Sequence, residues 1–226
     1  MDTNDFQRAR SPQAKQQREA AILDAARALG VEHGIRQITL TDIAAAVGMH
    51  KSALLRYFET REKIFLRLTA AGWQEWTPVL CAEIGRAADG DAAGVAEAFA
   101  RTLAARGMFC DLLAQAPMNL ERNVSVEAVR EFKLVTMEAV TAVVAAVRER
   151  LPELTEGDGV DLIAAATSMA GTFWNIATPG PEVAALYRSD PRLAHAIVDV
   201  EPRLARILTA LLEGATARRR GAAPPH

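Results

Sequence analysis

Hydrogen-bond donors gather in one short segment of the chain. Lys51, Ser52 and Arg56 lie within six residues of one another and carry ammonium, hydroxyl and guanidinium groups. Such groups suit base edges, and lysine or arginine facing guanine is the commonest base-specific contact in DNA complexes. We therefore predict that these three side chains read base edges. The residues expected to hold phosphates are Thr39, Thr41, Tyr57, Arg61 and Lys63, while His50 could do either.

A helix-turn-helix would place these donors on one exposed surface. Thr39 and Asp42 have the spacing of a capping box, which predicts that a helix begins there. Gly48 follows this helix and permits the sharp turn that a side chain would hinder. The second helix is predicted over residues 50–58, with Leu54 pointing inward. The same pattern would position the donors for the major groove.

An upstream helix is expected to brace this pair. Ser11 can cap it, Pro12 suits its first turn and Gly34 is a plausible stop. Its buried face would consist of residues at helical spacing, namely Ile22, Ala26 and Leu29. Three cations either form an arm that touches phosphates or lie in a solvated terminus: Arg8, Arg10 and Lys15.

Residues 20–68 resemble the DNA-binding domain of the tetracycline-repressor (TetR) family of bacterial transcriptional regulators. The resemblance rests on the run GMHKSALLRYF over residues 48–58 and on the capped helix opening that follows at Thr60. Three residues depart from the family's usual run. Leu55 replaces a tyrosine, Ala53 replaces a hydroxyl residue, and His50 stands where serine is common. These changes weaken the carried-over contacts but leave the hydrophobic frame intact.

Composition indicates an all-α protein. Half of the 226 residues are hydrophobic, only 5% are aromatic, and no segment shows a sustained strand alternation. We expect an N-terminal three-helix domain with a helix-turn-helix and an arm (1–68), a larger helical effector-binding and dimerisation domain (69–217), and a disordered tail (218–226). The net charge of −2 does not exclude DNA binding, because positive charge can be confined to one face.

Further helices are predicted in the second domain. One begins at Thr60 and is kinked or ended by Pro78, and residues 157–159 are interpreted as a turn. The remaining segments with helical spacing are 91–106, 108–116, 125–151, 160–177 and 202–214. TetR-like proteins generally dimerise through their last two long helices, so the resemblance implies a homodimer through 160–177 and 202–214. The alternative is that both helices serve only the intramolecular core.

The resemblance also implies a repressor that binds a near-palindromic operator on double-stranded DNA and is released by a small effector. Bulky, adaptable side chains suit a largely apolar effector cavity, although such residues at helical spacing more often belong to an ordinary core. The candidates for this pocket are Trp73, Met108, Phe109, Met118, Phe132, Met137, Met169, Phe173 and Trp174. Three polar residues could anchor the effector, or serve as caps or surface groups: Asn119, Thr172 and Asn175.

Other classes of function lack support in the sequence. The four histidines (His33, His50, His195 and His226) are far apart, and no nucleotide-binding, hydrolase or metalloprotease motif is present, so we expect no catalysis, metal or cofactor. Isolated Cys81 and Cys110 favour reduced thiols in the cytoplasm, with a redox role left open. No apolar stretch approaches the ~20 residues of a membrane span. A helical interaction module that has lost DNA affinity remains an alternative, because hydroxyls are missing at Ala53 and Leu55.

Overall fold

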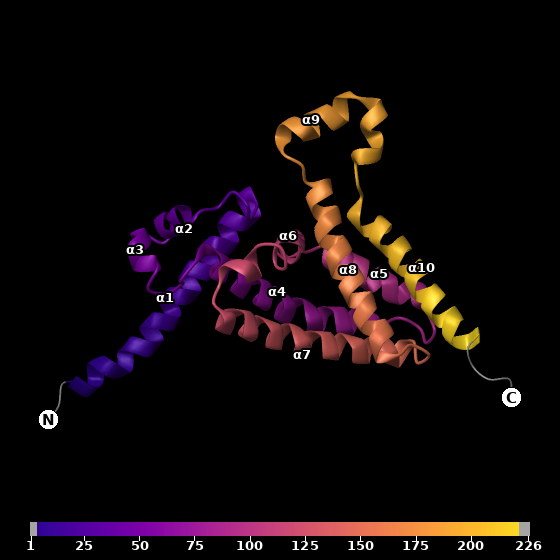
Figure 1. Ribbon diagram of the computed structural model, residues 1–226, viewed down its shortest axis with the longest axis horizontal. Helices are drawn as coiled ribbons and strands as arrows, with labels where there is room; N and C mark the ends of the chain where they lie inside the picture. Colours follow the sequence, from indigo (N-terminus) through magenta and orange to yellow (C-terminus); the bar gives the residue numbers. More distant parts are fainter. Residues whose placement is uncertain (1–3, 222–226) are drawn as a thin grey trace.

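A computed structural model describes residues 4–221 of the chain, with side chains described over residues 12–218. All regular structure in this part of the chain is helical, which confirms the predicted all-α class. Figure 1 shows a small group of helices at the N-terminal end, which we call the head, joined to a larger group, which we call the body. The cations Arg8 and Arg10, predicted to form part of an arm, lie outside the side chains that the structure describes.

Three helices form the head: α1 (Asn4–His33), α2 (Leu40–Ala46) and α3 (Lys51–Leu54). The helix predicted to begin at Ser11 begins instead at Asn4, so Pro12 lies inside α1 and not in its first turn. Gly34 follows α1 with φ of 76°, which confirms the predicted stop, because residues with side chains rarely adopt this conformation. Burial of Ile22, Ile43 and Leu54 fixes the three helices around one small core.

The body is a layered bundle of longer helices. Its elements are α4 (Arg61–Ile84), α5 (Ala92–Ala104), α6 (Gly107–Gln115), a 3₁₀ turn η1 (Leu120–Asn123), α7 (Val126–Arg150), α8 (Glu156–Ala177), α9 (Pro181–Ser189), a 3₁₀ turn η2 (Pro191–Ala196) and α10 (Val200–Gly221). Figure 1 shows α4 leading from the head into the body beside α7, while α8 and α10 form the opposite side. Only the short turn of residues 55–60 separates α3 of the head from α4 of the body.

An aromatic cluster forms the centre of the body. The rings of Trp73 and Trp76 on α4 pack edge to face with centroids 5.4 Å apart, and Phe99 and Phe109 complete the cluster. Gly72 permits this packing, because a Cβ there would lie 2.3 Å from the Phe109 ring. The indole N–H of Trp76 donates to Thr102 at 2.9 Å, so its burial leaves no unpaired donor.

Several predicted boundaries in the body are wrong. Pro78 does not end α4, which continues to Ile84; the proline faces solvent, where water can satisfy the carbonyl that it leaves unpaired, and the predicted kink there stays a prediction. Residues 157–159 are the first turn of α8, because Thr155 and Asp158 form a capping box there. Helix α10 runs to Gly221, so the first residues of the predicted tail are helical, and residues 222–226 lie outside the described part of the chain.

Candidate nucleic-acid interface and effector cavity

Helix α2 begins at the predicted capping box. The Asp42 carboxylate accepts from the backbone N–H of Thr39 at 2.8 Å and from its hydroxyl at 2.7 Å, while the Thr39 hydroxyl accepts from the Asp42 N–H at 3.3 Å. These bonds to Thr39 lower the pKa of Asp42. At the other end of α2, Gly48 turns the chain with φ of 64°, as predicted. Both ends of the first helix are therefore set by local chemistry.

His50 caps α3 in the position where serine is common. Its ring Nδ1 accepts from the backbone N–H of Ser52 at 3.3 Å and lies 2.8 Å from the Ser52 hydroxyl. The imidazole therefore keeps the cap that the substitution could have removed. Helix α3 ends at Leu54, earlier than the predicted 50–58, but tight turns continue the helical path to Phe58.

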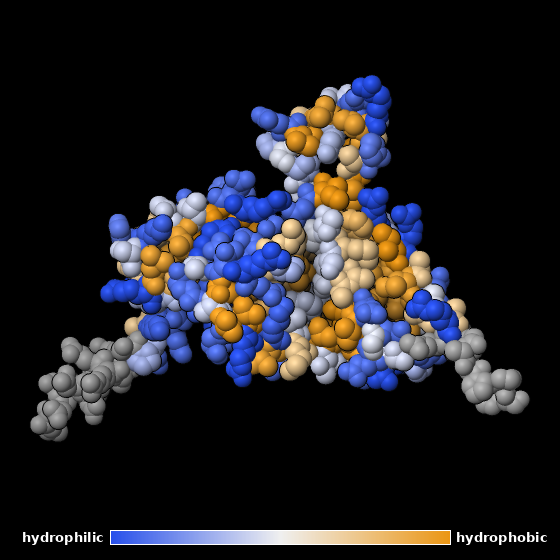
Figure 2. All heavy atoms as spheres, in the orientation of Figure 1, coloured by the Kyte–Doolittle hydropathy of each residue, from blue (hydrophilic) through white to orange (hydrophobic). Residues whose placement is uncertain are grey.

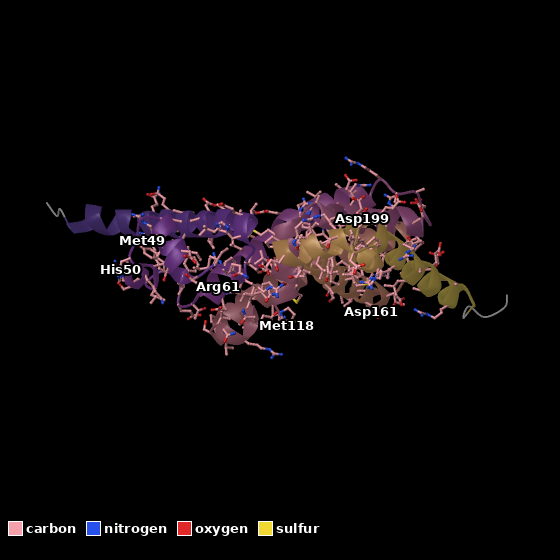
Figure 3. The ribbon with its side chains drawn as sticks, turned by 90° about the horizontal axis from the view of Figure 1, so that it is seen from above. Met49, His50, Arg61, Met118, Asp161 and Asp199 are labelled. Atoms are coloured by element: carbon pink, nitrogen blue, oxygen red, sulfur yellow. The ribbon has the colours of Figure 1, made fainter. Side chains whose placement is uncertain are left out.

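The second helix presents the predicted base readers to solvent. Lys51, Ser52 and Arg56 are exposed, whereas Leu54 and Phe58 are buried in the head. Figure 3 shows Met49 and His50 near the outer end of the head, far from Asp161 and Asp199 in the body. A short helix with a cationic outer face and an apolar inner face is thus free to approach a groove.

The predicted phosphate contacts divide into two groups. Thr39 and Thr41 are exposed, and Tyr57 and Lys63 are half-buried at the edge of the head, with the Lys63 ammonium 3.8 Å from the Glu59 carboxylate. Arg61 instead points inward. It donates to the carbonyl oxygens of Ile35 and Ile38, an arrangement that ties α4 to the turn between α1 and α2.

Arg61 has further internal partners. Its guanidinium pairs with Glu62 at 3.1 Å and lies over the Phe65 ring, 4.7 Å from the centroid. Three of the five guanidinium N–H groups of Arg61 are therefore used inside the protein, and this arrangement braces the head against α4. The phosphate role predicted for Arg61 from the sequence stays a prediction that these internal bonds disfavour.

Hydrogen bonds join the head to the body around the end of α1. The backbone N–H of Ile35 donates to the Asp111 carboxylate on α6 at 3.2 Å, and Arg36 donates to the Asn175 amide oxygen on α8 at 2.6 Å. The Asn175 amide nitrogen in turn donates to Asp111 at 3.4 Å. Helices α6 and α8 of the body therefore both form hydrogen bonds with the turn that follows α1 in the head.

Two more contacts link the head and the body. Arg27 on α1 forms a two-pronged ion pair with Glu75 on α4, at 3.0 and 3.3 Å. On the other side, the Glu59 carboxylate accepts from the backbone N–H of Ser125 at 3.0 Å, and this bond lowers the pKa of Glu59. The head is thus held at separate points, each through polar groups that a small movement could break.

A cavity of about 940 Å³ lies between the head and the body. We call it the interdomain cavity. It is lined by the end of α1 and its turn (residues 27–37), by α4 (68–75), by the α5–α6 region (105–112), and by the end of α8 with the loop that follows (174–181). Its volume is within the range that holds small-molecule ligands. The Arg36–Asn175 and Ile35–Asp111 contacts lie in its wall.

Two family descriptions match adjoining parts of the chain. Residues 22–68 match the bacterial regulatory proteins of the tetR family, and residues 70–219 match the tetracyclin repressor-like C-terminal domain. The chain belongs to the TetR family. It is therefore a DNA-binding transcriptional regulator whose head is the family's helix-turn-helix domain. No curated protein matches the sequence at a significant level.

Solved structures share the TetR fold at low sequence identity. RolR in complex with resorcinol is 14% identical, with a TM-score of 0.53, over 95% of this chain and 98% of RolR. The fatty acid degradation regulator FadR from Bacillus halodurans is 16% identical, with a TM-score of 0.50, over 91% of this chain and 99% of FadR. A TetR/AcrR-family regulator from Thermobifida fusca is 19% identical, with a TM-score of 0.50, over 92% and 100%.

The candidate pocket residues of this TetR-family chain are not brought together in one place. Met108, Phe109 and Trp174 line the interdomain cavity, whereas Phe132 lines a smaller cavity of about 230 Å³ between α1, α4 and α7. The other candidates lie elsewhere. Trp73 is buried in the aromatic cluster, and Met169 and Phe173 are half-buried against the core.

Two of the pocket candidates lie on the surface. Met118 and Met137 have exposed fractions of 73% and 59%, and neither lines the interdomain cavity or the smaller cavity beside α7. Arg36 and Asp111 could not be predicted from the sequence, because their partners are distant in the chain and no local pattern connects them. Asn175, one of three possible polar anchors in the sequence, is the residue of that group in the cavity wall.

The described residues contain neither a metal-binding cluster nor a membrane-spanning helix. No group of three histidine, cysteine or carboxylate side chains there could hold a metal ion. No helix in that part of the chain is long and apolar enough to cross a membrane.

Proposed function

We propose that this TetR-family regulator represses transcription as a homodimer on a near-palindromic operator and that a small molecule in the interdomain cavity releases it. The observation that carries the proposal is the orientation of α3. Lys51, Ser52 and Arg56 face solvent on a helix whose opposite face is anchored by Leu54 and Phe58. This arrangement supports reading of base edges by the three donors.

Other side chains around α3 suit the phosphates on either side of the groove. We assign this role to Thr39, Thr41, Tyr57 and Lys63, which are exposed or half-buried at the edge of the head. Arg61 is left out because its donors are used internally. The hydroxyls missing at Ala53 and Leu55 reduce the number of phosphate contacts, but they do not remove the cationic face formed by Lys51 and Arg56.

The outer face of α8 supports a symmetric dimer. Five residues at four-residue intervals are exposed along it, namely Val160, Ala164, Ser168, Thr172 and Ile176. Small side chains at this spacing let two helices approach closely. In Figure 2 this part of the surface, over α8 and α10, carries one of the broader hydrophobic areas of the face shown. A two-fold dimer would place two heads on half-sites about 34 Å apart or a multiple of that distance.

The sequence left open whether α10 pairs with a second copy or packs only within its own protomer, and we assign both roles to this helix. Leu204, Leu208 and Leu212 are buried against the protomer's own core, so this leucine stripe serves the intramolecular packing. Ala210 lies on the opposite side of the helix and Leu211 at the edge of the leucine stripe, and both are exposed. We therefore assign the dimer contact to α8 and to the exposed side of α10 that includes these two residues.

The lining of the interdomain cavity indicates the character of the effector. Met108, Phe109 and Trp174 offer apolar and aromatic surface, while three arginines and two carboxylates also line it: Arg27, Arg36, Arg106, Glu75 and Asp111. A purely apolar molecule would leave these charges poorly solvated. We therefore propose an amphiphilic effector, with a ring or chain and at least one polar group, in place of a largely apolar one.

Release would follow from competition for the contacts in the cavity wall. An effector that forms hydrogen bonds with Arg36, Asn175 or Asp111 would compete with the bonds that these residues make at the turn of residues 35 and 36. If it binds more tightly when the head is displaced, it lowers operator affinity by that difference in binding free energy. Couplings of this kind are typically about 1–3 kcal/mol, or some 5–150-fold in affinity.

The test is selection of random DNA duplexes by the full-length protein. We expect a near-palindromic motif, and Arg56→Ala should change the selected bases at about 1–3 kcal/mol per lost contact. Arg86→Ala is the matched control, because Arg86 is an exposed arginine just beyond the end of α4 that is distant from the head. Failure to select any motif would favour the helical interaction module instead, and an unchanged motif with Arg56→Ala would remove that residue as a base reader.

A further inference from the structure

A segment of the body projects away from the rest of the molecule. Residues 179–198, which we call the projecting hairpin, contain α9 and η2 and connect α8 to α10. Figure 1 shows them standing above the ends of both helices, and Figure 2 shows them as a separate lobe on a narrow neck. The hairpin is therefore the part of this fold with the least support from its own protomer.

Burial agrees with that shape. No residue of α9 or η2 is buried, and the extensive packing of α9 is with η2 alone among the described elements. Apolar side chains nevertheless face outward. The exposed fractions of Val183 and Leu186 are 41% and 51%, and that of Ile197 is 61%. Val183 and Leu186 are three residues apart, so they share one face of α9.

A helix in this situation needs a partner. Isolated helices shorter than about 12–15 residues are marginal in water, and α9 has nine residues. Its local support consists of Pro181 at its start and the Asp190–Arg192 ion pair after its end, at 2.7 Å. Such features fix the ends of the segment but do not cover Val183 and Leu186. An exposed apolar face on a marginal helix indicates that another surface packs against it.

The position of the hairpin identifies that surface. It emerges from α8 and returns into α10, the two helices to which we assign the dimer contact. Ile176, near the end of α8, is exposed on the proposed dimer face, and Ile197 is exposed where the hairpin returns to α10. The apolar surface of the hairpin is thus a continuation of the proposed interface. We infer that the projecting hairpin packs against the second copy of this chain, and this inference rests on the proposed homodimer.

The base of the hairpin also touches the interdomain cavity. Thr178 and Pro179 to Pro181 contribute to its lining, next to Trp174 and Asn175. Packing of the second copy against the hairpin therefore holds residues 178–181, one wall of the proposed effector site, in place. A molecule in the cavity of one protomer would thus contact the base of a hairpin that packs against the other protomer.

The test compares two matched pairs of exposed apolar residues in the full-length protein. Val183→Ser with Leu186→Ser removes the apolar face of the hairpin. Leu134→Ser with Met137→Ser is the control, because these residues have the same spacing and are also exposed, on α7. We expect the hairpin variant to raise the dimer dissociation constant about tenfold or more in analytical ultracentrifugation, and the control to change it less than about twofold.

Hydrogen exchange of the unmodified protein provides a second measurement. Amides of residues 183–189 should become protected as protein concentration rises through the dimer dissociation constant. A dimer that is weakened by Ala164→Arg but not by the hairpin variant, and whose α9 amides stay unprotected, overturns the inference and leaves the proposed function standing. A protein that stays monomeric at every concentration overturns both.

Discussion

The guanidinium of Arg36 donates a 2.6 Å hydrogen bond to the amide oxygen of Asn175. Arg36 belongs to the turn after α1 in the head, and Asn175 lies near the end of α8 in the body. The amide nitrogen of Asn175 also donates to Asp111, which accepts from the backbone N–H of Ile35. One asparagine therefore connects, directly and through a carboxylate, to two successive residues of the head.

Asn175→Ala tests this connection. We expect faster hydrogen exchange at the Ile35 amide, because the carboxylate that accepts its bond loses a neighbour that orients it. The loss in free energy of unfolding should be about 1 kcal/mol, the net contribution of a typical hydrogen bond. Thr141→Ala, an exposed threonine on α7, is the control. Unchanged exchange at Ile35 would show that Asn175 does not support the turn.

Arg61→Ala should destabilise the protein without altering the electrostatics of DNA binding. Bonds from charged donors contribute about 1.5–3 kcal/mol each, and Arg61 donates to two backbone carbonyls of the head. Urea denaturation would measure the loss, and the salt dependence of operator binding should keep its slope. A slope reduced by about one with unchanged stability would instead restore Arg61 as a phosphate contact.

Gly48→Val should disrupt the head through its backbone. A Cβ at Gly48 would meet no other atom within 4 Å, so the cost comes from φ of 64° and not from a clash. The expected loss is about 1–2 kcal/mol, with weaker operator binding. Gly214→Ala is the opposite case, because Gly214 lies in the interior of α10 with open space around it, and alanine should stabilise the helix by roughly 0.5–1 kcal/mol. Equal effects of both variants would show that backbone conformation is not the cause.

Acid should remove the contribution of the α2 capping box. Hydrogen bonds from Thr39 lower the pKa of Asp42, so the folded state favours the ionised carboxylate. This stability is present above the unfolded pKa of about 3.9 and is lost as pH falls through the lower folded pKa. Asp42→Ala should therefore flatten the decline in urea midpoint below about pH 4. Asp24→Ala, an exposed residue on α1, should leave that decline as it is.

Both cysteines should be slow to react in the folded protein. Burial raises the pKa of the Cys110 thiol to about 12, and burial with the nearby Glu149 carboxylate raises that of Cys81. Since the thiolate is the reactive form, alkylation by iodoacetamide near neutral pH should be slow until the protein is denatured. Mass spectrometry of native and denatured samples measures this. Rapid native labelling of either cysteine would reopen the redox role that the sequence left undecided.

The head was predicted well because its determinants are local. Thr39, Asp42 and Gly48 act within a few residues of one another, and the structure shows the cap and the turn at those positions. The internal bonds of Arg61 were missed for the complementary reason. A cation at a helix start suits a phosphate equally well, and its actual partners are carbonyls of residues 35 and 38. Nothing in the local pattern distinguishes the two.

The candidate effector site could not be assembled from the sequence. Residue type predicted Met108, Phe109 and Trp174, but it also predicted Met118 and Met137, which are on the surface. Size and flexibility do not indicate which face of a helix is covered when several helices pack together. The hairpin was missed for another reason. Helix α9 buries nothing in its own protomer, so no core pattern marks it.

Helix α4 runs unbroken from the contacts that Arg61 makes with the head to Ile84 in the body, so a rotation of the helix moves the head. Its 24 residues span about 36 Å at 1.5 Å per residue. A rotation of about 5° about the aromatic cluster, roughly 20 Å from Thr60 along the helix, would therefore swing the Thr60 end by about 2 Å, most of the length of a hydrogen bond. The aromatic cluster packs around the helix near its middle, so a ligand that tilts α4 slightly at this point would move its Thr60 end. The displacement of the head from its DNA half-site would then depend on the length of α4 and not on the size of the ligand.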